Sequence, residues 1–564
     1  MYSKCELGPN FEELKNNIER NLSDHDFDEI CAIDEDLVTE ALGKMKGGKD
    51  DVMFSFSSDC IINGPPLLKM HLANLFRVFL VHGQVADILL LCSLIPIVKD
   101  GLADLTSSEN YRAIAKSSLI LKLFDWVILL HQGEKLSSDE LQFGYQKLSS
   151  TVMCTWAASS VISHFNQAGS DVFGALLDCS KAFDMVEWVT LFSEMIKRKV
   201  SFIFLRVLLY IYSKQKCDDS WNGCKSFQFG VSNGVRQGAV SSPILFGIYV
   251  DKLIKMLRLS GLGCTIGKYY FGVIVYADDI ILLSPSRMGL QAMMNICQKF
   301  AATHNLKFST NRDPDKSKTK CIHFSRKRQN LASITLNGDK LPWVESAKHV
   351  GNILERDNSF TKDVRSKRAV FIGNVHRILQ EFYFANPLVK MNLISKYATS
   401  FYGSSLWSLF DGMCDKLFTA WNNAVRDTFD IPRGSHRFFI EPISDHLHPL
   451  VMLSSRFVKF HETLKTSQKP SMRFLSLLSS SNCRTVYFKN LRGIFDRIHA
   501  DSDLDVTANH VKKNMYYCRP TDEQKWKISL LKDILECKWN FIEIAVLDDN
   551  VIDMETMINE LCLG

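Results

Sequence analysis

Two adjacent carboxylates, Asp278 and Asp279, interrupt an otherwise apolar run from Phe271 to Leu283. Burying one ionised carboxylate without a partner is costly, and two neighbouring carboxylates also repel each other. A plain hairpin turn is the alternative explanation, although turns usually recruit Gly or Asn rather than two acids. A divalent cation would remove the conflict, because magnesium takes carboxylate oxygens together with phosphate oxygens as ligands. The pair therefore predicts a metal site for phosphoryl chemistry.

A site that holds two metal ions generally needs a further carboxylate from a neighbouring strand. Asp178 is the best candidate, because it follows the apolar, strand-like run of residues 172–177. Asp184 is the competitor, but its place after the strand favours a role in capping or fixing the following helix. The predicted metal ligands are Asp178, Asp278 and Asp279.

Three segments around these carboxylates resemble motifs of reverse transcriptases, in that family's order. Residues 177–184 (LDCSKAFD) resemble motif A, residues 234–246 (GVRQGAVSSPILF) motif B and residues 276–279 (YADD) motif C. Six further segments extend the match: 94–99, 110–112 and 142–145 resemble the fingers, 316–324 motif D, 347–353 the primer grip and 401–407 a segment after the thumb helices. Together they make the chain similar to the reverse transcriptases of non-LTR (LINE-type) retrotransposons.

The resemblance implies an α+β fold with the right-hand polymerase architecture of fingers, a palm with an antiparallel sheet, and a helical thumb. We expect an N-terminal helical extension (1–60), fingers (61–170), a palm interleaved with part of the fingers (171–355), a thumb (356–431) and a C-terminal helical region of unknown role (432–564).

Apolar periodicity predicts individual elements within this frame. Strands are expected at residues 94–98, 172–177 and 227–231, with a hairpin at 271–283. Helices are expected at 11–45 with Asp34 as a cap, and at 67–80, 119–130, 188–212 and 243–259. Residues 361–431 are expected to be mostly helical, and residues 479–483 to form a polar loop.

The family's chemistry assigns roles to the matching residues. Asp178, Asp278 and Asp279 would hold two Mg²⁺ ions, with Mn²⁺ as an alternative, and the implied partners are an RNA template, a DNA primer and dNTPs. Phe183, five residues after Asp178, stands where the family places a ring that excludes the ribose 2′-hydroxyl. The alternative is that Phe183 only packs under a helix.

Further residues are expected to bind the incoming nucleotide. Gly238 and Gln237 lie in the turn before the motif B helix, where glycine permits a close backbone approach. Arg112 and Lys99 are candidates for the triphosphate, although either could be a solvated surface charge. Lys318 is the candidate motif D lysine that would protonate pyrophosphate, with Lys316 and Lys320 as close competitors.

Composition sets broad limits. The chain has 564 residues, 46% hydrophobic residues and a net charge of +5, which fits a folded protein and permits a nucleic-acid partner. Its 16 cysteines include no CxxC, which argues against a zinc knuckle or a disulfide framework. The most apolar segment, residues 85–98, is shorter than the about 20 residues that a membrane span needs. We therefore expect an intracellular protein that is neither secreted nor membrane-bound.

Some positions depart from the family pattern. Ala113, Gln146 and the loop at residues 50–56 differ from the usual fingers sequence, so nucleotide binding is more open to question than metal binding. We also expect no upstream endonuclease domain. A degenerate or domesticated copy that binds nucleic acid without polymerising is the main alternative. An RNA-dependent RNA polymerase is a further one, disfavoured by Phe183 and the fingers matches.

Overall fold

The structure is a computed structural model that describes residues 9–54, 56–99, 101, 104–236, 238–311, 313, 316–500, 506–518, 520–539 and 554–563. It is a mixed α+β protein, as predicted. The N-terminal part is helical: α1 (Pro9–Arg20), α2 (Asp24–Cys31), α3 (Glu35–Lys44), α4 (Ser58–Ile62) and α5 (Pro66–His82). Asp34 accepts a hydrogen bond from the Leu37 amide at 2.8 Å and so caps α3, which confirms that prediction.

A first sheet follows these helices, and its strands run in the order β2-β1-β4-β5, with β6 also paired to β4. The strand predicted at residues 94–98 is confirmed as the second half of β1, where Pro96 lies beyond the pairing with β4 and needs no donor on that edge. The strand predicted at 227–231 shrinks to two residues, because β6 pairs only with Lys216 and Cys217. The strands are β1 (Leu91–Val98), β2 (Tyr111–Ser117), β4 (Lys216–Trp221), β5 (Cys224–Lys225) and β6 (Phe229–Gly230).

The second sheet is fully antiparallel, in the order β11-β3-β10-β9. Its strands are β3 (Val172–Asp178), β9 (Val273–Tyr276), β10 (Asp279–Ser284) and β11 (Lys320–Phe324). Helix α7 (Thr151–Gln167) contacts β3 and β9, while α11 (Arg287–Thr303) contacts β3 and β10. Almost every residue of β3 and β10 is buried, so both faces of this sheet are covered and its strands are continuous apolar runs.

The predicted helix over residues 188–212 is wrong in one respect, because the structure divides it into α8 (Trp188–Lys197) and α9 (Phe202–Lys214). Lys199 has a left-handed backbone (φ +59°). The Val200 amide bonds to the Met195 carbonyl and the Lys199 amide to the Ile196 carbonyl, the two bonds of a Schellman helix end. Because lysine stands where such a helix end usually has glycine, the sequence gives no local signal that the helix ends here.

The other predicted helices are present as α6 (Leu119–His131) and α10 (Ser242–Leu259), and the predicted hairpin is present as β9 and β10. Short hairpins complete the middle of the chain: β7 (Thr265–Ile266) with β8 (Tyr269–Tyr270), β12 (Ile334–Leu336) with β13 (Asp339–Leu341), and β14 (Ser346–His349) with β15 (Asn352–Glu355).

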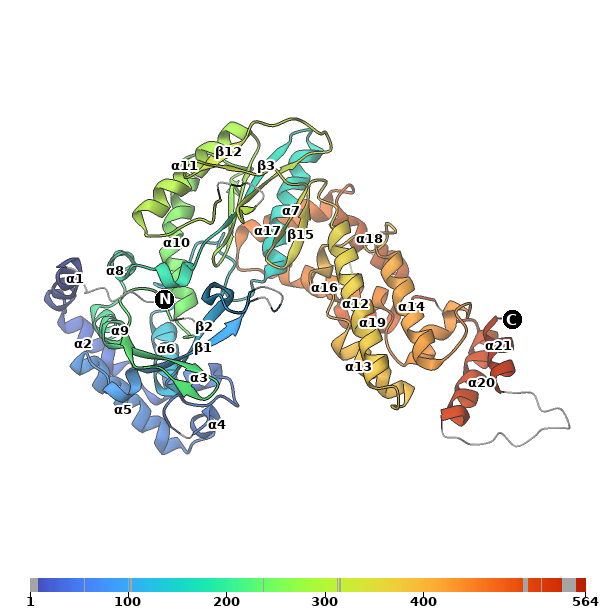
Figure 1. Ribbon diagram of the computed structural model, residues 1–564, viewed down its shortest axis with the longest axis horizontal. Coiled ribbons are helices and arrows are strands. Elements are labelled where there is room, and N and C mark those ends of the chain that lie inside the picture. Colours follow the sequence, from blue (N-terminus) through green and yellow to red (C-terminus); the bar gives the residue numbers. More distant parts are fainter. Residues whose placement is uncertain are drawn as a thin grey trace.

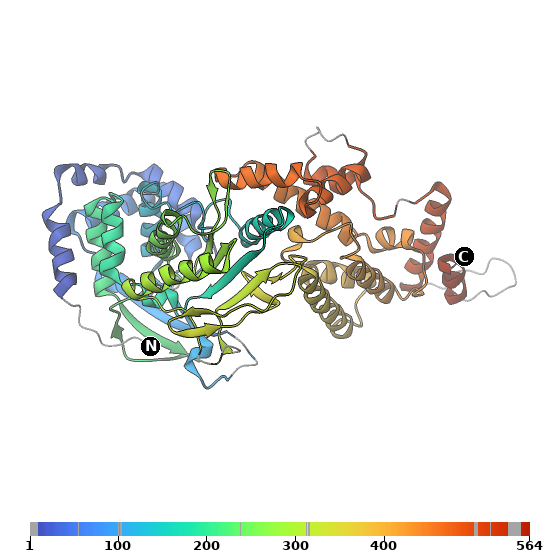
Figure 2. The same cartoon turned by 90° about the horizontal axis from the view of Figure 1, so that it is seen from above.

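From α12 onward the chain is helical, as predicted, and most of these helices extend away from the sheets (Figure 1). Figure 2 shows the same elongated arrangement from above, with the N-terminal helices and the last helices at opposite ends. The polar loop starts at Asn482, because residues 479–481 still belong to α17. The helices are α12 (Thr361–Glu381), α13 (Pro387–Tyr397), α14 (Asp415–Phe429), α15 (Ile440–Ser444), α16 (Pro449–Lys465), α17 (Pro470–Ser481), α18 (Val486–Ile498), α19 (Ala508–Asn514), α20 (Asp522–Trp539) and α21 (Met554–Leu563).

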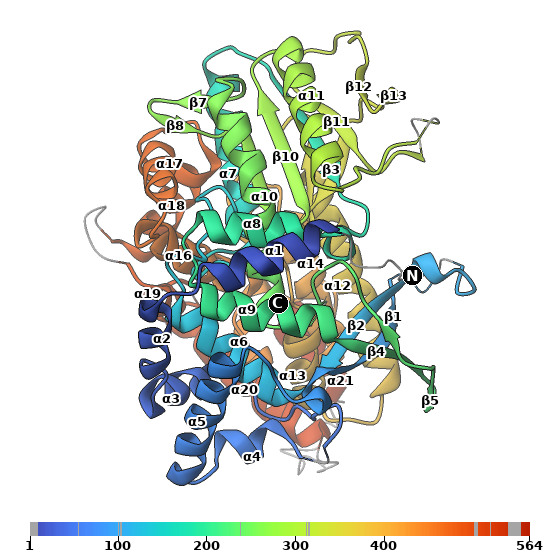
Figure 3. The same cartoon turned by 90° about the vertical axis from the view of Figure 1, so that its left-hand side faces the viewer.

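One of these helices returns to the second sheet. Helix α17 lies beside α7 in Figures 1 and 3, and the Phe474 ring of α17 lies 4.9 Å from that of Tyr269. Within the described residues, no helix is both long and apolar enough to cross a membrane.

Candidate active site

The turn between β9 and β10 carries the acidic pair. Tyr276 pairs with Asp279, which leaves Ala277 and Asp278 as a two-residue loop. Ala277 has φ +56°, the positive angle that a type II′ hairpin turn requires at its first central position. Such a position favours glycine, so the turn needs support from elsewhere in the fold.

That support comes from residues 141–144, which overlap the segment 142–145 that resembles a fingers motif. The side-chain carbonyl of Gln142 accepts hydrogen bonds from the Ala277 amide at 2.9 Å and the Gly144 amide at 2.8 Å. The Phe143 amide also donates to the Val275 carbonyl at 2.7 Å. A Cβ atom at Gly144 would lie 2.5 Å from the Ala277 nitrogen, so only glycine permits this approach. The segment therefore positions the acidic turn from behind.

Sheet register brings the three predicted carboxylates together. Asp178 lies directly opposite Asp279 on β3 and β10, and Asp278 precedes Asp279 in the turn. Burial, reinforced by Asp278 and Asp178, raises the pKa of Asp279 to about 6. Burial also raises the pKa of Asp278, with Asp178 adding to the rise and the Arg112 guanidinium opposing it. The site thus concentrates negative charge where water is scarce.

The donor chemistry of this cluster fits Mg²⁺. Among the described residues, no three His, Cys, Asp or Glu side chains form a closed cage that could hold a metal alone. Magnesium is usually held by one or two carboxylates, with waters and substrate phosphate oxygens completing its octahedron. Asp178, Asp278 and Asp279 form an open set of neighbouring carboxylates, which matches that pattern.

Four basic residues from separate segments act on one another beside the carboxylates. Burial lowers the pKa of Lys99, and the charges of Arg112, Lys318 and Lys181 lower it further. The Lys99 ammonium donates to the Glu109 carbonyl at 2.7 Å. Three of these four residues were predicted, and the structure brings all three together.

Lys181 is the residue that sequence reasoning missed, although it lies inside the motif A match. Its backbone is left-handed (φ +50°), and its ammonium lies 3.8 Å from a Glu109 carboxylate oxygen. The available signal was a positive charge three residues after a predicted metal ligand. Of the competitors to Lys318, Lys316 pairs with Asp313 at 3.7 Å and Lys320 begins β11.

Phe183 packs against the motif B helix. Its ring stacks on that of Phe246 of α10, with centroids 4.7 Å apart and planes 15° apart, and it stays partly exposed. Asp184 lies beside it in the 3-10 turn Ala182–Met185. Asp184 is not the N-cap of the next helix, because that position is Glu187, three residues later. That Asp184 fixes this helix in another way stays a prediction.

The turn before α10 touches β2 at close range. Gly238 has φ +117°, and a Cβ atom there would lie 2.7 Å from the Ala115 carbonyl oxygen. Gln237, the neighbouring predicted nucleotide contact, lies outside the described residues. The glycine requirement at position 238 therefore has a local packing cause.

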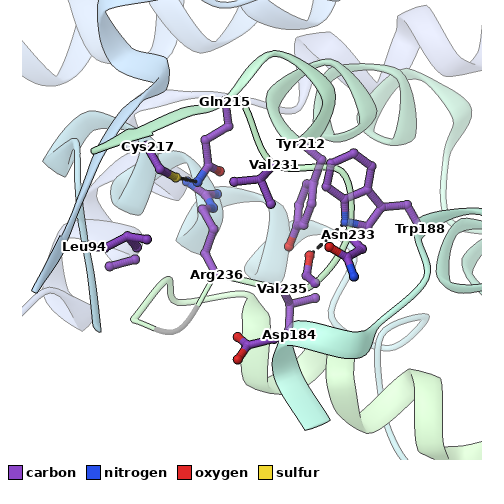
Figure 4. A pocket seen from close by; sticks show the side chains of 12 residues that line it. Leu94, Asp184, Trp188, Tyr212, Gln215, Cys217, Val231, Asn233, Val235 and Arg236 are labelled. Carbon is purple, nitrogen blue, oxygen red and sulfur yellow. Dashed lines mark hydrogen bonds between the residues drawn. The ribbon is translucent and has the colours of Figure 1, made fainter. Parts of the chain in front are cut away.

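Arg236 anchors the same turn in the interior. Its side chain is 7% exposed and lies 3.9 Å from Asp125 of α6, whose side chain is 3% exposed. Figure 4 shows Arg236 pointing toward Gln215 and Cys217, beside a cavity of about 20 Å³. The Trp188 indole donates to the Gly234 carbonyl at 2.8 Å on the other side of the turn. Nothing local in the sequence distinguished this buried arginine from an exposed one.

Comparison with known proteins agrees with the sequence motifs. Residues 97–345 match the family described as "Reverse transcriptase (RNA-dependent DNA polymerase)". A Pol polyprotein of the type-1 retrotransposable element R2 from Nasonia vitripennis is 26% identical over 39% of this chain and 21% of its own length. The RNA-directed DNA polymerase of the mobile element jockey from Drosophila funebris is 24% identical over 59% of this chain and 36% of its own. The chain thus aligns with only about a fifth to a third of these relatives.

A solved structure of telomerase from Candida albicans, in complex with a fragment of telomeric RNA, also overlaps the chain. It covers 69% of this chain and 65% of its own, at 11% identity and a TM-score of 0.30. An overlap this loose carries no argument about the fold.

Asp279→Asn tests the charge conflict in the metal-free protein. Because the folded pKa of about 6 exceeds the ordinary 3.8, the unfolded state releases its proton first, and wild-type stability falls as pH rises between those values. In EDTA at about pH 7.5 we expect Asp279→Asn to unfold at a higher temperature than wild type, with the difference vanishing near about pH 4. Asp533→Asn on α20 is the control. A lower unfolding temperature for Asp279→Asn at the higher pH would contradict the idea that the Asp279 charge destabilises the metal-free protein.

Arg236→Met tests the buried anchor. Removing one partner of a buried ion pair typically costs about 3–5 kcal/mol, so we expect a clear drop in the free energy of unfolding measured with urea. Arg484→Met, at an exposed position, should change it by less than about 0.5 kcal/mol. Equal effects for the two variants would show that Arg236 is not an anchor.

Proposed function

We propose that this chain, in which residues 97–345 are a reverse transcriptase domain of the non-LTR retrotransposon type, is an RNA-directed DNA polymerase that adds dNMP units to a primer 3′-hydroxyl. The observation that carries the proposal is the cross-strand placement of Asp178 opposite Asp279, with Asp278 in the adjoining turn. Three neighbouring carboxylates at the end of a buried sheet, two of them with raised pKa values, favour a role in binding a cation over a structural one.

Asp178, Asp278 and Asp279 would hold the two Mg²⁺ ions, or Mn²⁺ in their place. When bound, the ions activate the primer hydroxyl and neutralise charge on the triphosphate. The carboxylates' part is to hold their oxygens on one side of the sheet. The Gln142 side chain would hold the turn in place, because its carbonyl oxygen accepts hydrogen bonds from the Ala277 amide of the turn and from the Gly144 amide of its own segment.

The basic cluster of Lys99, Arg112, Lys181 and Lys318 would bind the triphosphate. Its members lie near one another and near the carboxylates, since the charges of Arg112, Lys181 and Lys318 all act on Lys99 and Arg112 also acts on Asp278. A guanidinium fork suits phosphate, and ammonium groups add point charges around it. Lys318 would then donate a proton to the leaving pyrophosphate.

Phe183 would exclude the ribose 2′-hydroxyl. The stack on Phe246 fixes one face of the ring against α10, which gives the exposed part a defined position. The close contact of Gly238 with β2 would hold the Gly238 backbone beside the new base pair. Gln237 stays a predicted nucleotide contact.

The division of the chain into a 1–60 extension, 61–170 fingers, 171–355 palm, 356–431 thumb and 432–564 C-terminal region remains our proposal. RNA template and DNA primer would lie against α12, which carries Lys362, Arg365 and Lys367. Lys362 and Lys367 already donate to Ser346 and to the Gly351 carbonyl, so they would hold the β14–β15 hairpin as well.

Primer extension tests the activity directly. Purified protein with a primed RNA template, Mg²⁺ and dNTPs should extend the primer, and Asp278→Asn should lower the rate by at least about a thousandfold because a metal ligand is lost. Asp533→Asn should extend normally. Wild-type extension no greater than that of Asp278→Asn would contradict polymerase activity and favour a degenerate copy that only binds nucleic acid.

Phe183→Ala tests sugar selection. Removing the ring should lower the ratio of kcat/KM for dNTP to that for rNTP by about tenfold or more, because the 2′-hydroxyl loses its steric barrier. Phe246→Leu should lower the ratio by less, because it keeps the Phe183 ring and removes only the stack that positions it. An unchanged ratio in Phe183→Ala, or a larger loss in Phe246→Leu than in Phe183→Ala, would remove Phe183 from this role.

A further inference from the structure

The acidic turn is supported by a second layer from the far end of the chain. The ammonium of Lys469, just before α17, donates to the Glu140 carbonyl at 2.6 Å and to the Gln142 carbonyl at 2.9 Å. It also lies 4.7 Å from the centroid of the Phe143 ring. The contact joins residues 327 positions apart in the sequence. Two carbonyls and a ring face thus use all three donor directions of one lysine.

The segment that Lys469 contacts is the one that holds the turn. Its other edge bonds to β9, where the Val275 amide donates to the Leu141 carbonyl at 2.9 Å. Between the two edges, Gln142 is 1% exposed and Phe143 is fully buried. A shift of this segment would move the Gln142 side chain, and with it the Ala277 amide and the neighbouring Asp278.

A second contact fixes the same segment from the same side. The Ser471 hydroxyl donates to a Glu140 carboxylate oxygen at 2.8 Å. Farther along α17, the Asn482 side-chain amide donates to Gln167 at the end of α7 at 2.7 Å. The docking is therefore specific at both ends of α17.

The ammonium of Lys469 lies in a buried environment with specific acceptors. Burial lowers the pKa of Lys469 to about 8, while Glu140 and Asp139 oppose that change. A solvated surface lysine would experience neither the burial nor the two converging carbonyls. Replacing the ammonium with an apolar group would leave both carbonyls without this donor in a buried place.

We propose that Lys469 is a positioning residue for the acidic turn, and that the C-terminal helical region is therefore a working part of the catalytic unit. The inference rests on the proposed polymerase function for its kinetic consequences. Its structural consequence, a more mobile turn when Lys469 is lost, is independent of activity.

Lys469→Met in the full chain tests this. If the turn is misplaced, kcat for dNTP addition should fall by about tenfold to a hundredfold while KM for dNTP changes by less than about twofold, because the metal carboxylates and not the nucleotide contacts move. The Mg²⁺ concentration for half-maximal activity should rise. Lys469→Arg, which keeps the positive donor, should restore part of kcat. The control is Lys459→Met, at an exposed position on α16.

Hydrogen exchange separates this proposal from the polymerase proposal. Amides of residues 273–279 should exchange at least about fivefold faster in Lys469→Met than in wild type, and at the wild-type rate in Lys459→Met. If Lys469→Met does not fold, Ser471→Ala should show the same changes to a smaller extent. An inactive wild type with faster exchange in Lys469→Met would sink the polymerase proposal alone. Unchanged exchange, or equal kinetic losses in Lys469→Met and Lys459→Met, would overturn the role of Lys469.

Discussion

Repulsion among three carboxylates at the end of a buried sheet is the constraint that shapes the centre of this molecule. The antiparallel register of β3 and β10 places Asp178 opposite Asp279, and like charges on opposite strands destabilise a sheet. Burial adds a desolvation cost and raises the pKa values of Asp278 and Asp279. The Arg112 guanidinium offsets part of this at Asp278, and the surrounding elements must hold the strands in place against the remaining repulsion. A bound cation would neutralise these carboxylates, so the negative charge that destabilises the metal-free sheet would favour cation binding.

Several contacts hold the acidic turn in place, and they come from segments that lie progressively farther away in the sequence. Ala277 has a positive φ angle, which is unfavourable for alanine. The Gln142 side chain stabilises this conformation by accepting a hydrogen bond from the Ala277 amide. Gly144 permits the approach, and Lys469 fixes the carbonyls of the same segment. The side chains of Gln142 and Lys469 both bind backbone groups, namely the Ala277 amide and the carbonyls of Glu140 and Gln142. The C-terminal helices therefore contribute to the site without supplying a ligand.

The positive side of the site is built differently. Lys99, Arg112, Lys181 and Lys318 come from four segments and keep much of their exposure, as groups that must exchange a charged ligand with water should. The motif B turn, by contrast, is anchored inward by Arg236 and by the Trp188 indole. An inward-anchored turn and an exposed basic cluster suit the proposed function, because the turn would keep its shape while the cluster exchanges a charged ligand with water.

The sequence by itself determined the strands and the turn that carry Asp178, Asp278 and Asp279. An apolar run interrupted by acidic residues is a local signal, because it indicates buried strands that end in charged groups. It also indicated most helices, since their apolar periodicity is local. It failed where a lysine ended α8 in place of glycine, and where Asp184 looked like a cap. Only the tertiary structure revealed Lys181 beside Lys99, Arg236 beside Asp125 and Lys469 beside Gln142. Those contacts join segments distant in the chain, and their geometry comes from helix packing that no local pattern specifies.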